Sequence, residues 1–187
     1  MKLQDLFILS AAAVAPGALA ADPQVDVRTS AGTIRLELYP EKAPKTVENF
    51  LQYLRDGHYD GTVFHRVIDG FMIQAGGMDQ GYREKATRKP IENEAKNGLQ
   101  NDLGSIAMAR TSAPHSASSQ FFINVKNNDF LNYPGQDGWG YAVFGKVISG
   151  LDVVMKIAKT PVGPGRGGEH TPRQPVVIES MTVVGAK

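Results

Sequence analysis

Residues 64–77 read FHRVIDGFMIQAGG, and this stretch decides how the chain folds. β-branched and aromatic residues flank Asp69-Gly70 on both sides, a pattern that predicts two short strands joined by a turn. Because side chains alternate between the faces of a strand, we expect Arg66 to share a face with the apolar Phe64 and Ile68. A permanent cation there either keeps its guanidinium in water at a sheet end or belongs to a binding site.

Two glutamines favour the binding site. Gln74 lies near the end of the stretch, and Gln120 begins a second apolar run, QFFINV at 120–125. A guanidinium, two amides and several aromatic rings on one concave surface would make an apolar pocket with a few fixed polar groups. Ligand sites usually have this composition.

The composition indicates one globular domain. The 187 residues are 42% hydrophobic and 21% charged, enough for a sizeable core. With 20 basic and 19 acidic residues, the net charge of +1 gives no electrostatic reason to expect nucleic acid or an anionic membrane as the main partner. Cysteine is absent, which excludes disulfides, a thiol nucleophile and cysteine metal ligands.

Residues 1–20 have the pattern of a cleavable secretory signal peptide. Lys2 precedes an apolar run at 6–14, and Ala18-Leu19-Ala20 matches an A-x-A cleavage site. The apolar run is far shorter than the roughly 20 residues of a membrane-spanning helix. We therefore expect residues 21–187 to form a single exported domain, in the periplasm of a Gram-negative bacterium or secreted otherwise.

The remaining chain predicts many short strands and two helices. Apolar residues recur with helical spacing at 43–56, and a second short helix is expected at 151–159. Alternation and turn signals predict about eight strands, which suggests a β-sandwich or a closed barrel. The strands are expected at 25–28, 33–38, 63–68, 71–73, 104–109, 121–125, 141–147 and 176–184, and long loops at 79–103 and 161–175.

Several familiar chemistries lack their motifs. The four histidines are far apart and form no zinc motif, so no metal is expected. Ser118-Ser119 follows His115, but no G-x-S-x-G motif or acidic partner supports a hydrolase. The glycines at 76, 77 and 81 match no nucleotide-binding motif, and no cofactor is expected.

Arginine stays protonated, so a site built on Arg66 suits a reaction without proton transfer. Rotation about a prolyl peptide bond is such a reaction. Its barrier, about 18–20 kcal/mol for peptide bonds in general, comes from resonance between the nitrogen lone pair and the carbonyl. A guanidinium that donates toward the prolyl nitrogen would weaken this resonance, and an apolar pocket would hold the ring.

Three motifs, in this order, resemble the cyclophilin family of peptidyl-prolyl cis-trans isomerases, most closely its periplasmic bacterial type. They are FHRVI with GFMIQ at 64–74, SQFFI at 119–123 and VFGKV at 143–147, and the resemblance extends over about 25–184. It implies a mainly β fold, a closed eight-stranded antiparallel barrel capped by two α-helices. It also implies an active face on the outside of the barrel.

The resemblance also implies roles for individual residues. Arg66 is similar to the catalytic arginine, and Gln74 to the residue that orients it and the substrate carbonyl. The remaining matched positions are Phe71, Met72, Phe121 and Leu131 as walls of the proline pocket, Ala109 and Arg110 as the edge whose backbone pairs with the substrate, and Gln120 in the neighbouring groove.

Two substrate-binding positions depart from the family pattern. Phe130 stands where many eukaryotic members have a tryptophan whose indole donates to cyclosporin, so we expect weak cyclosporin binding. Tyr141 stands where a histidine often lines the pocket, so no histidine role is expected there.

The sequence therefore predicts a monomeric isomerase that acts on X-Pro bonds of proline-containing polypeptides during the folding of exported proteins. A proline-peptide binding module, or a holdase chaperone without useful turnover, would use the same pocket. A purely structural barrel would instead require the Arg66 and Gln74 side chains to diverge.

Overall fold

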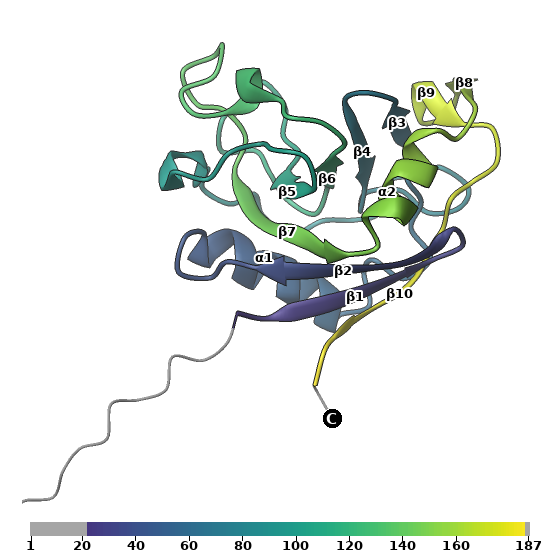
Figure 1. Cartoon of the computed structure of the whole chain (residues 1–187), viewed down its shortest axis with the longest axis horizontal. Helices are drawn as coiled ribbons and strands as arrows, with labels where there is room; N and C mark the ends of the chain where they lie inside the picture. Colours follow the sequence, from purple (N-terminus) through teal and green to yellow (C-terminus); the bar gives the residue numbers. More distant parts are fainter. Residues whose placement is uncertain (1–21, 186–187) are drawn as a thin grey trace, which may run out of the picture.

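The computed structural model describes residues 22–185, and the predicted signal peptide, residues 1–20, lies outside the described residues. Eight antiparallel strands form one strongly curved sheet (Figure 1). In spatial order they are β10 (Ile178–Val183), β1 (Gln24–Thr29), β2 (Gly32–Leu38), β7 (Val143–Ser149), β5 (Ser105–Met108), β6 (Phe121–Asn124), β4 (Met72–Ala75) and β3 (Arg66–Ile68).

The two ends of this sheet meet through a short bridge. β3 and β10 are the outer strands and form no continuous ladder with each other. Where these two strands begin, the Phe64 N–H donates to the Val176 carbonyl at 3.0 Å, and the Ile178 N–H donates to the Thr62 carbonyl at 2.8 Å. The eight predicted strands thus form a barrel-like sheet, but the predicted closure is incomplete, because only an isolated bridge joins the two ends within the described residues.

Helix α1 (Pro44–Arg55) closes over the interior of the sheet. It has Pro44 in its first turn and buries Val47, Phe50 and Leu54 on one face, as the helical spacing predicts. The Phe50 ring lies 5.7 Å from Phe121 of β6, between ring centroids. The main core therefore lies between α1 and the inner face of the sheet.

The N-terminus of α1 is capped by a residue that is distant in sequence. Its N-cap residue, Ala43, has no side chain that can accept a hydrogen bond. The Glu94 carboxylate accepts from the backbone N–H groups of Lys45 at 3.1 Å and Thr46 at 2.8 Å. This contact satisfies two of the free N–H groups of the helix and places a negative charge at the positive end of its dipole.

Helix α2 (Leu151–Ala158) lies against β2, β3 and β4. The segment after it was predicted as a loop but contains a small hairpin, β8 (Val162–Gly165) and β9 (Gly168–Pro172). Its glycines and prolines hide the alternating pattern of a strand, and packing of β9 against β3 supports the pairing instead. No described helix is long and apolar enough to cross a membrane.

Candidate active site

A row of side chains on the outer face of the sheet defines the candidate site. Arg66 of β3 lies opposite Gln74 of β4, and Gln74 lies opposite Phe122 of β6. Residues in register on neighbouring strands point to the same face, so the three side chains come together. They border a cavity of about 240 Å³, whose lining comprises Arg66, Phe71, Met72, Gln74, Ala109, Arg110, Phe122, Phe130, Leu131 and Tyr141.

A chain of hydrogen bonds holds the guanidinium at this cavity. Arg66 Nη1 donates to Gln74 Oε1 at 3.4 Å, and Gln74 Nε2 donates to Gln120 Oε1 at 2.8 Å. The first bond is long, while the second fixes the amide in one orientation. None of the ion pairs within residues 22–185 involves Arg66. The half-buried cation can therefore donate to a ligand.

The opposite wall of the cavity is apolar. Met72, Phe122 and Leu131 belong to a small hydrophobic cluster on the outer face of the sheet, separate from the main core. The Tyr141 ring meets Phe122 edge-on, with ring centroids 5.8 Å apart. Such a surface can bind a compact apolar ring beside the guanidinium.

Comparisons with known proteins agree with this geometry. The family model of cyclophilin-type peptidyl-prolyl cis-trans isomerases matches residues 24–183. The chain belongs to this family. The predicted family, fold class and enzyme class are thereby confirmed.

Curated bacterial relatives of this cyclophilin-type chain are named isomerases. It is similar to isomerase B of Escherichia coli (strain K12), at 55% identity over 163 residues that cover 85% of this chain and 98% of the relative. It is also similar to isomerase A of Dickeya dadantii, at 48% identity over 181 residues that cover 95% of this chain and 93% of the relative.

A solved structure has the same fold. A cyclophilin-type isomerase from Cryptosporidium parvum, crystallised in the presence of the dipeptide Ala-Pro, has 28% identity and a TM-score of 0.72. The match covers 87% of this chain and 99% of that chain.

The structure corrects one pocket residue of the cyclophilin-type site. Phe121, expected as a pocket wall, is fully buried in the main core between Phe50 and Tyr59, and Phe122 lines the cavity instead. Strand alternation could have identified Phe122 from the sequence. Gln120 and Phe122 lie on one face of the strand, and Phe121 lies on the other. Phe64, expected on the face of Arg66, likewise lies in the main core ahead of β3.

A second cavity of about 190 Å³ adjoins the first. Gln120, expected in a neighbouring groove, lines it. The sequence argument missed Thr111, Ser116 and Ser118, which also line it and come from the polar loop at 110–118. A polar loop between two strands of the site was the only available signal.

The histidines form no catalytic set with these residues. His65 is buried beside Arg66, and burial lowers the pKa of its imidazole, which favours the neutral ring. His115 Nδ1 accepts from the Asn93 N–H at 3.0 Å, and the Ser119 hydroxyl has no partner in the described structure. Within residues 22–185, no three His, Asp or Glu side chains gather as metal ligands would.

Proposed function

We propose that Arg66 catalyses rotation about X-Pro bonds by donating to the prolyl nitrogen, while the apolar wall holds the proline ring. The observation that carries this proposal is an arginine without an ion-pair partner in the described structure, aimed by Gln74 at an apolar cavity. In this mechanism Gln74 orients the guanidinium and donates to the substrate carbonyl. Phe71, Met72, Phe122 and Leu131 enclose the ring.

The physical argument concerns the amide nitrogen. In the planar ground state its lone pair is delocalised into the carbonyl, and in the twisted transition state the lone pair returns to the nitrogen. A hydrogen bond from Arg66 to that lone pair is therefore stronger in the transition state than in the ground state, which is the condition for catalysis. Each 1.4 kcal/mol or so of such preference raises the rate about tenfold.

The substrates under this proposal are proline-containing segments of folding polypeptides. The Cryptosporidium parvum relative crystallised with Ala-Pro supports this class of substrate. Ala109, Arg110 and Gln120 border the path that the chain on either side of proline would follow. We also propose that the protein acts as a monomer on exported proteins, in the periplasm of a Gram-negative cell, because of the leader-like residues 1–20.

The test is the cis-to-trans rate of an Ala-Pro peptide with the mature protein, Arg66→Ala and Arg28→Ala. Arg28 is an exposed arginine of β1 outside both cavities, so its variant controls for loss of charge. We expect acceleration that falls about 100-fold in Arg66→Ala and is unchanged in Arg28→Ala. Equal turnover by a folded Arg66→Ala would remove Arg66 from the mechanism.

The second candidate, a proline-peptide binding module or holdase chaperone, uses the same cavity. It predicts that Arg66→Ala binds peptide and suppresses aggregation of an unfolded client as well as the wild type does. Measuring peptide affinity on the same variants separates the two functions.

A further inference from the structure

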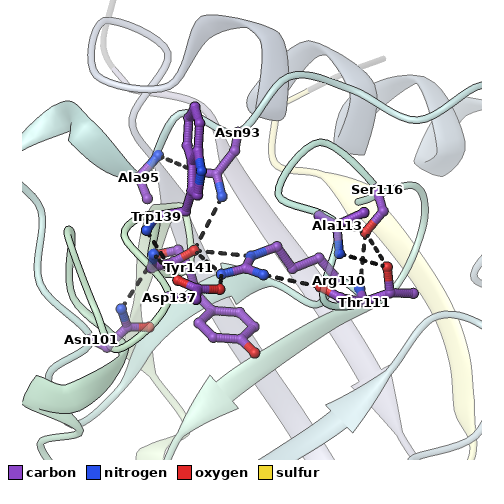
Figure 2. Close-up of polar contacts among 11 residues, drawn as sticks. Asn93, Ala95, Asn101, Arg110, Thr111, Ala113, Ser116, Asp137, Trp139 and Tyr141 are labelled. Carbon is purple, nitrogen blue, oxygen red and sulfur yellow. Dashed lines mark hydrogen bonds and ion pairs between the residues drawn. The ribbon is translucent and has the colours of Figure 1, made fainter.

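The side chain of Arg110 is almost completely enclosed beside the site. Only 2% of it is exposed, and it forms an ion pair with Asp137. Its Nε donates to the Gly140 carbonyl at 3.0 Å, its Nη2 to the same carbonyl at 2.9 Å, and its Nη1 to the Thr111 carbonyl at 3.0 Å (Figure 2). With the bond to Asp137, the five N–H groups of the guanidinium make four hydrogen bonds.

Asp137 links this arginine to the folding of the loop at 132–140. Its Oδ1 accepts from the backbone N–H groups of Trp139 at 3.0 Å and Gly140 at 3.1 Å, while Oδ2 faces Arg110. The hydrogen bond from Arg110 is the largest cause that lowers the pKa of Asp137 to about 2. The carboxylate is thus ionised at neutral pH and holds the turn and the arginine together.

The loop is further fixed at Gly140, whose carbonyl also accepts from Asn93 Nδ2 at 3.1 Å. Gly140 has a φ of +69°, and a Cβ there would lie 2.7 Å from the Tyr133 nitrogen. Three donors thus converge on the Gly140 carbonyl and fix the end of the loop to Arg110 and Asn93.

This network reaches the proline cavity through Tyr141. The Arg110 guanidinium lies 4.4 Å from the centroid of the Tyr141 ring, a cation–π contact. The same ring also meets Phe122 edge-on and lines the cavity that Arg66 borders. Movement of Arg110 would therefore move a cavity wall.

We propose that Arg110 is a positioning residue that sets the proline cavity through Tyr141 and the 132–140 loop, and that its charge does not select substrates. The proposal rests on the isomerase function proposed above. The guanidinium of Arg110 is already paired with Asp137 and hydrogen-bonded to backbone carbonyls, so few of its N–H groups can bind an acidic substrate residue. The planar fork makes these contacts at once, which a lysine ammonium cannot reproduce.

Trp139 provides a spectroscopic readout of the loop. It is the only tryptophan of the 187 residues, and its ring meets His115 edge-on at 4.7 Å between ring centroids. His115 belongs to the loop that borders the second cavity. Emission from Trp139 therefore reports whether the two loops keep their contact.

The experiment compares Arg110→Lys and Asp137→Asn with the matched control Arg35→Gln. Arg35 forms a two-bond ion pair with Asp26 in the β1–β2 hairpin and lines neither cavity. Isomerisation is measured on peptides with Glu, Lys or Ala before proline, together with peptide affinity, thermal midpoint and Trp139 emission. Asn at 137 keeps an oxygen for the turn, so this variant tests the ion pair even if Arg110→Lys folds poorly.

We expect Arg110→Lys and Asp137→Asn each to lower kcat/KM about 10- to 100-fold by the same factor on all three peptides, with weaker peptide binding and shifted Trp139 emission. The double variant should lose little more than either single variant, because both remove one contact. Arg35→Gln should match the wild type in kcat/KM and emission.

A loss confined to the Glu-Pro peptide would overturn the proposal and make Arg110 a charge-recognition residue. Unchanged kcat/KM in a folded Arg110→Lys, even with altered emission, would also overturn it. If the wild type itself does not isomerise, the proposed function fails, and the effect of Arg110→Lys on the affinity for the three peptides decides the positioning role separately.

Discussion

Replacing Phe121 or Phe122 by alanine tests the assignment of the two faces of β6. The rings are adjacent in sequence, but Phe121 belongs to the main core and Phe122 to the wall of the proline cavity. Phe121→Ala should therefore act mainly on stability, and Phe122→Ala should be the one that lowers turnover. Because both variants replace a phenylalanine by alanine at adjacent positions, each serves as the control for the other.

The magnitudes follow from the surroundings of each ring. Phe121 is fully buried and lies edge-on to Phe50 and Tyr59, at 5.7 and 5.5 Å between ring centroids. Removing such a ring costs about 3–5 kcal/mol, because the enclosed site leaves a void. For a domain of this size, the thermal midpoint should fall by roughly 6–20 °C.

Phe122 is 4% exposed and already borders an open cavity, so its loss adds no enclosed void. The transfer contribution alone, about 1.5–3 kcal/mol, should be lost from folding. If the proline ring loses a similar free energy of contact in the transition state, kcat/KM should fall roughly 10- to 100-fold.

The assay combines thermal unfolding with kcat/KM on an Ala-Pro peptide, measured at least 15 °C or so below each midpoint. We expect Phe121→Ala to have the lower midpoint and to keep kcat/KM within about threefold of the wild type. A folded Phe121→Ala with the greater loss of turnover, or a Phe122→Ala with unchanged turnover, would refute the assignment.

Three further predictions concern the helix cap, pH and cyclosporin. Glu94→Ala should lower the free energy of unfolding by about 1–2 kcal/mol, because it removes the only side chain that caps the N-terminus of α1 in the described structure. The control, Glu48→Ala on the exposed face of α1, should change the thermal midpoint little. The thermal midpoint should fall as pH drops below about 6.5, because burial lowers the pKa of His65 and His58 in the folded state. Below that pH the unfolded chain binds more protons than the folded chain, which favours unfolding. A midpoint independent of pH between about 7 and 5.5 would contradict this. Phe130→Trp should strengthen cyclosporin binding in a calorimetric titration, because it adds an indole donor at the cavity rim, where Phe130 is 48% exposed. Equal affinities of the variant and the wild type would show that this position does not control cyclosporin binding.

Local patterns were sufficient for most of the elements. Helical spacing located α1, alternation located β1 and β2, and a continuous apolar run located β6, each to within a residue or two. The polar Arg66, Gln74 and Gln120 within apolar runs also pointed to one site, and the structure brings them together in a hydrogen-bonded chain. These predictions succeeded because neighbouring residues in the sequence decide periodicity and burial.

The sequence alone was enough to predict the mainly β fold and the two helices, because strand and helix patterns depend on residues that are close along the chain. Only the tertiary structure decided which side chains meet across loops. Arg110 and Asp137 are 27 positions apart, and Glu94 caps α1 from 48 positions beyond Thr46. Such contacts depend on the path of the backbone in space, which no local pattern encodes.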